Sequence, residues 1–595
     1  MISERDDRMA SSLITLTVFF VLLCSGGALV CALGRGSFED ALPLTCTAIM
    51  TAGFVFGIAG LLPAGFYAAL AAAVSAIAAA IYLLVRNGAG DFRKRFFTPG
   101  FFIFAALYIF LAAINYGMRL TSWDEFSHWG DIVKVMTTIG GFGTAAMSDS
   151  MFPAYPPAMA LFQYFCERIY MLVSGESMSE WLLYFSYQTF MFAMFFPFLR
   201  RFDLKKPWSW AFFAVIWLLP LIFQRNAYSK IYIDSFLSVL LALGLAHALI
   251  DREGERLDRL NLAAILILLP LTKSIGLPFA AAVLIAVFAA EYGERTEGFR
   301  RRCALYTCAA LVPRAAWELH VRLSRAVSGY GPSAQIAAEH FGNRDYTGAV
   351  LSDYLEALVR RPLTNEEAIC PQLCALAVLA LLTAALWLLL KRESDSRNGD
   401  KLYPRAFALL LAVNVLFFAI MGAGFMYAYP ESDALELLGM ERYLNNILMA
   451  DAVLALMLTA DLISRGAVGT KRAAAAVLAA ALLFTPFRTA ARTLTRRDVH
   501  TTQALHSRFE PYYETLNALT QGERCDILFA ADRSDTIEFM LLRTELRPSY
   551  VEMMPLPESV ARFDYVVIYD LASPPDGTEN GGIYAVDGEE LIRVN

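Results

Sequence analysis

The sequence predicts an α-helical polytopic membrane protein with a small α/β domain at its C-terminal end. Of the 595 residues, 57% are hydrophobic and only 18% are charged, which is typical of a chain that lies largely in a bilayer. The apolar residues gather in runs close to the length of about 20 residues that a spanning helix needs. Hydropathy falls and soluble patterning begins near residue 495.

The apolar runs predict about 12 to 14 transmembrane helices. The candidate segments are, in chain order, 12–33, 42–62, 66–85, 101–118, 180–199, 208–223, 231–250, 260–272 with 274–290, 303–323, 371–390, 404–428, 443–463 and 473–489. We divide the chain into N-terminal transmembrane helices (1–100), a transmembrane core (101–490) and an extracytoplasmic α/β domain (491–595).

Short basic loops predict the orientation, because cytoplasmic loops carry an excess of Lys and Arg. Six loops are basic: 86–95, 200–206, 252–259, 295–302, 391–405 and 465–472. The loops between them, the N-terminus and all residues after 490 are then expected outside the cytoplasm of a plasma membrane. The first large outer loop, 119–179, holds an apolar stretch at 157–173 that follows a Pro-Pro pair and carries polar residues, so we expect an interfacial helix there.

The residues after 495 predict a domain of about 100 residues. We expect helices at 508–520 and 535–543, strands at 526–531 and 564–569, and a terminal hairpin with Gly581-Gly582 and Asp587-Gly588 turns. The nine cysteines include no CxxC pair, which argues against structural zinc and a disulfide framework. The formal charge of −6 is small for this length, and the pattern argues against nucleic-acid binding.

The motif Trp123-Asp124-Glu125-Phe126-Ser127-His128-Trp129 follows a span that ends outside. In a helix beginning near 123, an apolar stripe would lie on lipid and a polar face would carry Asp124, His128 and Asp131. The stripe consists of Phe126, Trp129, Val133 and Met136. A structural interpretation stays open, because Ser122 and Glu125 fit a capping box and the tryptophans fit interfacial anchors.

Other charged or polar groups stand at the same expected boundary. They are Tyr155 before Pro156-Pro157, then Arg225, Lys230 and Asp234 in QRNAYSKIYID, Lys273 within a long apolar run, and Glu441-Arg442-Tyr443 at the start of a span. An ionisable residue between apolar segments is a functional candidate. Two alternatives remain: Lys273 could reach the interface as a snorkelling lysine, and Arg442 could pair with Glu441.

In this order, the motifs resemble the GT-C superfamily of polyprenyl-phosphate-sugar glycosyltransferases, of the protein O-mannosyltransferase and lipid A aminoarabinose transferase type. The resemblance covers about 100–465. It differs in having three expected spans before the motif and Ser274 rather than Gly after Lys273.

The resemblance implies an inverting glycosyltransferase with an undecaprenyl- or dolichyl-phosphate sugar donor. Asp124 would be the general base and Glu125 would orient it or the acceptor. Lys273, Arg442, Tyr443 and Arg225 would bind the donor phosphate. His128, Asp234 and Tyr155 would contact the acceptor, or His128 and Asp234 would hold a divalent ion with Asp124. We expect no metal and no other cofactor.

The expected partners are the polyprenyl-phosphate-linked sugar, the lipid bilayer, and a glycan, glycolipid or protein acceptor. Two other functions stay open. A polymerase or ligase of lipid-linked glycans would use a large outer loop with basic residues, such as 324–370 with Arg325, His340, Arg344, Arg360 and Arg361. A lipid or polysaccharide transporter would also be polytopic, but it would have ionisable residues mid-helix and repeated halves.

Overall fold

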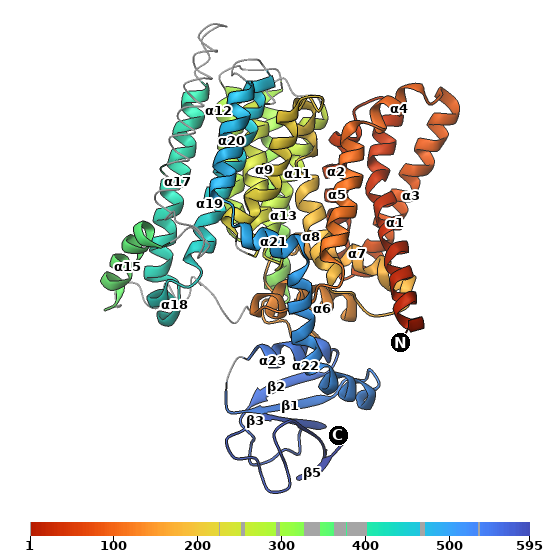
Figure 1. The fold of residues 1–595 in the computed structure, drawn as a ribbon, viewed down its shortest axis with the longest axis vertical. Coiled ribbons are helices and arrows are strands. Elements are labelled where there is room, and N and C mark those ends of the chain that lie inside the picture. Colours follow the sequence, from red (N-terminus) through yellow and green to blue (C-terminus); the bar gives the residue numbers. More distant parts are fainter. Residues whose placement is uncertain are drawn as a thin grey trace.

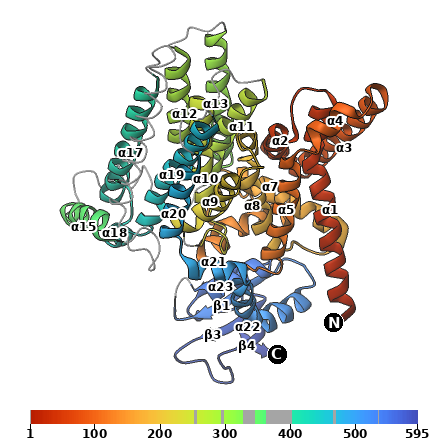
Figure 2. The ribbon, with the colours of Figure 1, turned by 45° about the horizontal axis from the view of Figure 1, so that its top comes forward.

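The computed structural model describes residues 2–224, 226–250, 256–292, 298–326, 345–361, 377, 402–464, 470–533 and 536–594. Helices make up the part before residue 520, and a mixed sheet lies near the C-terminus. Figure 1 shows the sheet domain below one end of the helices, with the N-terminus at that same end. Figure 2 shows the domain against the same end after a 45° turn.

The N-terminal helices pack against one another and against the helix that follows the first large loop. They are α1 (Ile2–Ala32), α2 (Phe38–Ile58), α3 (Leu62–Asn87), α4 (Gly90–Phe96) and α5 (Pro99–Asn115). Asp40 accepts hydrogen bonds from the backbone N–H and the hydroxyl of Ser37, at 3.0 and 2.9 Å, which fixes where α2 begins. Proline opens α5, where a missing N–H costs nothing.

The central part contains the other helices of the membrane region among the described residues. They are η1 (Glu125–Trp129), α6 (Asp131–Ile139), α7 (Ala158–Ser174), α8 (Trp181–Ala193), η2 (Phe196–Arg201), α9 (Pro207–Phe223), α10 (Asp234–Ile250), α11 (Arg256–Thr272), α12 (Gly276–Tyr292), α13 (Phe299–Leu323), α15 (Thr347–Arg360), α17 (Leu402–Tyr427), α18 (Glu431–Glu436), α19 (Met440–Ser464), α20 (Thr470–Phe484) and α21 (Phe487–Leu494). Helix α10 is buried along its whole length and packs against α19, α12 and α11.

Five described helices are long and apolar enough to cross a membrane, or seven if each of two bent pairs forms one span. The bent pairs are α4 with α5, at 48°, and residues 475–484 with α21, at 88°. The number is below the 12 to 14 expected, because several expected spans form shorter apolar helices, among them α9 and α10 with 17 residues each. The expected span 371–390 lies outside the described residues, apart from position 377.

Ion pairs show which helix ends meet at the end remote from the sheet domain. Arg200 of η2 lies 3.1 Å from Asp40 of α2 and 2.5 Å from Asp258 of α11, and Arg201 lies 2.6 Å from Asp461 of α19. The start of α2, the start of α11 and the end of α19 therefore share this end. The helix ends beside three of the six basic loops, 200–206, 252–259 and 465–472, thus lie together, as expected of loops on one side of a membrane.

The C-terminal domain is a five-stranded sheet of order β2-β1-β3-β4-β5 that the long helix α22 (Arg497–Thr520) joins to the membrane part. Its other elements are β1 (Asp526–Ala531), α23 (Ile537–Glu545), β2 (Tyr550–Met554), β3 (Tyr565–Asp570), β4 (Gly582–Asp587) and β5 (Glu590–Arg593). Strand β1 pairs in parallel with β2 and β3, and the rest is antiparallel.

The predicted elements of this domain are all present, and β2 is additional. The apolar run of β1 suits a central strand covered on both faces, whereas β2 lies at the edge and carries Glu552 among apolar residues, so its pattern is weaker. One continuous core runs from Phe19 in α1 to Phe529 and Met540 in this domain. The domain is therefore packed onto the helices rather than tethered to them.

Candidate functional site

The segment with Asp124 begins a helix just after Ser122, as predicted. The N–H groups of Glu125 and Phe126 donate to the carbonyl of Ser122 at 3.0 and 3.1 Å. Residues 125–129 then form a π-helical turn, which holds more residues per turn than an α-helix. The turn shifts the angular position of every later side chain relative to Asp124.

Glu125 is fully buried and its carboxylate accepts five hydrogen bonds. One oxygen accepts from the N–H groups of Thr121 and Ser122, each at 2.9 Å, and from the Ser122 hydroxyl at 2.8 Å. The other oxygen accepts from the Tyr184 hydroxyl at 2.6 Å and from the N–H of Ile231 at 2.9 Å. Glu125 thus joins three segments of the chain beside Asp124.

The predicted apolar stripe is buried in protein, so the prediction that it lies on lipid is wrong. Phe126, Val133 and Met136 are at most 1% exposed, and Trp129 is 8% exposed. The Phe126 ring lies 6.3 Å from the His506 ring of α22, the Trp129 ring lies 5.6 Å from the Tyr155 ring, and α6 packs against α7, so several parts of the protein cover this face.

The predicted shared polar face is also wrong for Asp131. Asp131 binds Arg547 of the C-terminal domain at 2.6 Å, whereas Asp124 pairs with Arg442 of the membrane part. The π-helical turn breaks the regular period on which that expectation rested.

Four charged residues from four segments form a polar centre: Asp124, Asp234, Lys273 and Arg442. Arg442 donates from Nη1 to the Asp124 carboxylate, and its Nε lies 3.9 Å from Asp234 Oδ2. Lys273 Nζ donates to Asp234 Oδ1 at 2.8 Å. The centre therefore contains two carboxylates and two cations, drawn from positions up to 318 residues apart.

Local sequence explains how the centre is presented. Asp234 is the first residue of α10, where the helix dipole favours an acid. Lys273 lies in the break between α11 and α12. A Cβ at Gly276 would lie 1.8 Å from the carbonyl oxygen of Leu269, so only glycine permits this close return of the chain. Arg442 is in the first turn of α19.

The members of the centre differ in exposure. The side chains of Asp124 and Arg442 are 25% and 28% exposed and that of Lys273 is 16% exposed, whereas Asp234 is 1% exposed. Asp124, Arg442 and Lys273 can therefore meet a molecule from outside, and Asp234 is a buried counter-charge.

Tyrosine rings flank the two cations. The Arg442 guanidinium carbon lies 4.9 Å from the ring centre of Tyr232 and 5.2 Å from that of Tyr443. Lys273 Nζ lies 5.1 Å from the Tyr443 ring centre. Such contacts stabilise a cation without neutralising it. Tyr443 is thus placed beside both cations.

His128 and Tyr155 lie next to each other, with ring centroids 4.5 Å apart. Burial, with a smaller effect of Lys273, lowers the pKa of His128 to about 3. Burial, with Tyr443 and Asp124 adding to it, raises the pKa of Tyr155 to about 12. Both groups are therefore neutral near pH 7. Arg225 lies outside the described residues.

Two polar side chains of the site were not predicted. Asn446 donates to Asp234 Oδ1 at 2.9 Å, and Gln224 donates to Asn446 Oδ1 and to the Arg442 carbonyl, each at 3.2 Å. The sequence does place Asn446 one helical turn after Arg442 in an apolar helix, so the two side chains are expected on the same face.

The two cations have partners that differ from those of the alternative interpretations. Glu441 pairs with Arg361 at 3.0 Å, and Arg442 instead pairs with Asp124. Lys273 is held by Asp234 within the protein rather than extended to the interface as a free cation.

One group of possible metal ligands occurs among the described residues, and it lies at the C-terminal domain rather than at the polar centre. Glu180, His506 and Glu545 place their ligand atoms within 4.8 Å of one another. Arg119 contacts Glu180 at 2.8 Å and Glu545 at 2.6 Å, and Lys134 contacts Glu545 at 2.9 Å. Protein cations thus already neutralise these carboxylates.

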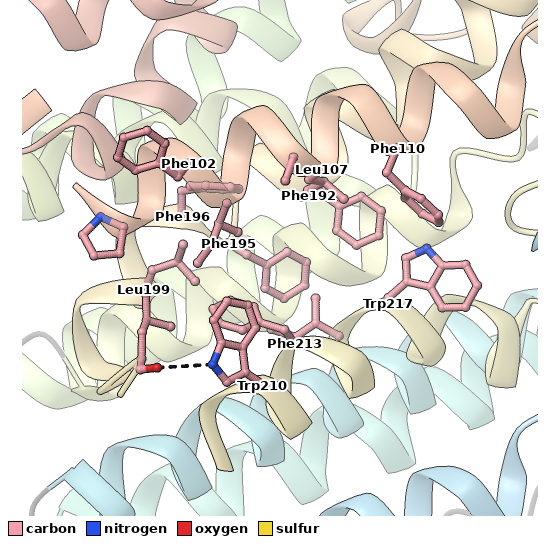
Figure 3. Close-up of a pocket in the computed structure, with 15 residues that line it drawn as sticks. Phe102, Leu107, Phe110, Phe192, Phe195, Phe196, Leu199, Trp210, Phe213 and Trp217 are labelled. Atoms are coloured by element: carbon pink, nitrogen blue, oxygen red, sulfur yellow. Dashed lines mark hydrogen bonds between the residues drawn. The ribbon is translucent and has the colours of Figure 1, made fainter. Parts of the chain in front are cut away.

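An apolar groove of about 560 Å³ lies between α5, the stretch 192–204 and α9. Figure 3 shows aromatic side chains of these segments facing one another, including Phe110, Phe195 and Trp217. Tyr228 stacks on Trp217 with ring centroids 5.1 Å apart. Tyr228 belongs to the loop 224–233 that also supplies Tyr232 to the polar centre, so groove and centre share one loop.

Comparisons with known proteins give one structural similarity. No family model matches the sequence, and no curated protein matches it. A solved structure titled "Crystal Structure of ArnT from Cupriavidus metallidurans bound to Undecaprenyl phosphate" aligns with a TM-score of 0.45 and 14% sequence identity. The alignment covers 76% of this chain and 85% of that chain.

Proposed function

We propose that this multi-pass membrane protein is a glycosyltransferase that moves a sugar from a polyprenyl-phosphate carrier to an acceptor on the extracytoplasmic side. The convergence of Asp124, Lys273 and Arg442 in the polar centre carries the proposal. These residues meet where apolar helices end, which is the depth at which the phosphate of a membrane lipid lies.

Lys273 and Arg442 would bind the carrier phosphate. Arginine can bind two phosphate oxygens at once, and lysine adds a point charge. Asp234 holds both cations from behind, since it is buried and lies 2.8 Å from Lys273 and 3.9 Å from Arg442. The cations are thus aimed before a phosphate arrives, which is how fixed charges stabilise a developing negative charge.

Asp124 would act as the general base. The acceptor hydroxyl oxygen would attack the anomeric carbon while the bond from that carbon to the phosphate oxygen breaks. The hydroxyl proton would pass to Asp124, and the bonding electron pair would remain on the phosphate, beside Lys273 and Arg442. Proton transfer needs a separation of about 3 Å between the heavy atoms, which the partly exposed Asp124 carboxylate can offer.

The remaining side chains would shape the site. Tyr443 and Tyr232 would border the phosphate because they already border its cations. His128 and Tyr155 are neutral and adjacent, so they would contact the sugar or the acceptor by hydrogen bonds rather than by charge. Glu125 would support the backbone that carries Asp124.

Binding of undecaprenyl phosphate to the purified protein in nanodiscs tests the proposal. Lys273→Met and Arg442→Met should each weaken binding by about 10- to 100-fold, since each removes a charge-assisted contact of about 1.5–3 kcal/mol. Arg361→Met is the matched control, because Arg361 pairs with the neighbouring Glu441 outside the polar centre. Undecaprenol, which lacks the phosphate, should bind all variants alike. Equal affinity of wild type and both variants for undecaprenyl phosphate would refute phosphate recognition here.

A further inference from the structure

The C-terminal domain contacts both ends of the segment 119–134, which carries Asp124. At the beginning of this segment, His506 of α22 lies 2.8 Å from the carbonyl oxygen of Leu120, and the N–H of Arg119 donates to the Thr502 hydroxyl at 3.2 Å. The contacts near its end are ionic and involve α23 and the residues just after it.

Glu545, the last residue of α23, joins the two ends of the segment with one carboxylate. Its Oε1 accepts from Arg119 at 2.6 Å and its Oε2 accepts from Lys134 at 2.9 Å. Burial alone would raise the pKa of Glu545, but Lys134, His506 and Arg119 outweigh it and hold the pKa well below its ordinary value. Glu545 therefore stays ionised and bridges both cations at neutral pH.

Arg547 fixes a second pair of acids from the same loop region. It donates to Asp131 at 3.0 and 2.6 Å and also pairs with Asp149. Asp131 is fully buried and the Arg547 side chain is 6% exposed. Water hardly reaches the Asp131 carboxylate or the Arg547 guanidinium, so separating them would leave two buried charges without this ion pair. Breaking this ion pair therefore costs much free energy.

Asp124 lies between these two anchors in the sequence, and its side chain pairs with Arg442 of the membrane part. Among the described residues, no ion pair joins the C-terminal domain to any of the four residues of the polar centre. The domain nevertheless binds the chain before and after Asp124, through Arg119 and Asp131. We propose that the C-terminal domain is a positioning element, and that Glu545 and Arg547 are the positioning residues that hold Asp124 in reach of the acceptor. The chemical part of this inference rests on the proposed function.

The proposal predicts a separation of catalytic rate from donor binding. Lys273 lies in the break between α11 and α12 and Arg442 lies in α19, so loosening the segment 119–134 should not weaken affinity for the carrier. A displacement of about 1 Å of a reacting group can cost on the order of 100-fold in rate, so Arg547→Met should lower kcat by roughly 10- to 100-fold. Arg547→Lys keeps one charge on Asp131 and should restore part of the loss.

The test uses the full-length protein in nanodiscs and three measurements: kcat of sugar transfer, affinity for undecaprenyl phosphate, and hydrogen exchange of peptides covering 119–134. Glu545→Gln provides a second, milder variant. Arg562→Met is the matched control, since Arg562 forms an exposed ion pair with Glu552 in the same domain, 2.9 Å apart and remote from the segment.

The expected result is faster exchange confined to 119–134, a lower kcat and no weakening of undecaprenyl phosphate affinity for Arg547→Met and Glu545→Gln, with no change for Arg562→Met. Wild-type exchange and wild-type kcat in both variants would overturn the proposal. Faster exchange throughout the helices would also overturn it, because the residues would then stabilise the whole fold. Exchange reports on positioning even if the protein transfers no sugar, so the two proposals fail separately.

Discussion

Replacing Asp124 by Asn separates chemistry from stability at the proposed base. The change keeps the shape of the side chain but removes its charge and most of its basicity. Positioned general bases contribute about 10²- to 10⁴-fold in rate, which corresponds to about 3–5 kcal/mol of activation free energy. Transfer by Asp124→Asn should fall by this factor or more.

The same substitution should hardly change the free energy of unfolding. Asp124 and Arg442 are 25% and 28% exposed, so water screens their ion pair. Pairs of this kind contribute about 0–1 kcal/mol to stability.

Replacing the adjacent Glu125 by Gln should instead lower the free energy of unfolding. Its carboxylate is fully buried and accepts five hydrogen bonds. The NH2 group of an amide would face at least one backbone N–H, that of Ile231, whereas the Tyr184 hydroxyl can turn and accept. At about 1.5–3 kcal/mol for each lost bond to a charged group, Glu125→Gln should lose at least about 1.5–3 kcal/mol.

The assay compares sugar transfer in membranes with thermal unfolding of the purified variants. Asp124→Asn should give a large loss of transfer with a Tm close to that of the wild type. Glu125→Gln should give a clear drop in Tm. Unimpaired transfer by Asp124→Asn would remove the general base from the mechanism, and a wild-type Tm for Glu125→Gln would show that the hydrogen bonds of Glu125 contribute little to stability.

Three further outcomes are expected. The pKa of His128 is about 3 in the folded chain and near 6.5 in the unfolded chain, so below pH 6.5 the unfolded state binds a proton that the folded state does not. The free energy of unfolding should therefore fall below pH 6.5, by at most about 1.4 kcal/mol per pH unit. For His128→Gln, the free energy of unfolding measured at several pH values should fall less steeply. Chelation with EDTA should leave transfer unchanged, because Lys273 and Arg442 supply the positive charge that a metal would otherwise provide; a loss restored by Mg²⁺ or Mn²⁺ would contradict this. Gly276→Ala should lower the Tm and weaken undecaprenyl phosphate binding, because the added Cβ would overlap the backbone of Leu269. Gly348→Ala is the control: no atom lies within 4 Å of the added Cβ, so the Tm and the binding should both stay unchanged.

Charges at the ends of apolar runs made part of the site predictable. Asp124, Lys273 and Arg442 stood out because an ionisable residue beside a spanning segment is costly unless it has a task. Which of these charges pair with one another, or with Asp234, could not be predicted. The Lys273–Asp234 and Arg442–Asp124 pairs join positions 39 and 318 residues apart, and no local pattern carries such distances. The neutral Asn446 was overlooked because a single amide in an apolar helix has little effect on hydropathy.

Periodicity predicted the helices but not which surface each side would meet. The spacing of Phe126 and Trp129 was correct for a helical stripe, yet protein rather than lipid covers it, since His506 of the distant C-terminal domain lies against Phe126 and Tyr155 lies against Trp129. The expected position of Asp131 failed for a different reason, because the π-helical turn at 125–129 changes the angular spacing. Hydropathy marked apolar runs but not where their helices end: among the described residues α9 and α10 are apolar helices of 17 residues, shorter than the spans expected there.

The ion pair between Asp124 and Arg442 has a consequence for the order in which substrates would bind. While Arg442 holds the carboxylate, the lone pairs of Asp124 are poorly available to a hydroxyl group. On the proposed function, a carrier phosphate would compete for the same guanidinium and would free the base when a sugar is in place. On the proposed function, the carrier binds first and the acceptor second, and water meets an inactive carboxylate until then. Initial-rate patterns with both substrates varied would reveal this compulsory sequence.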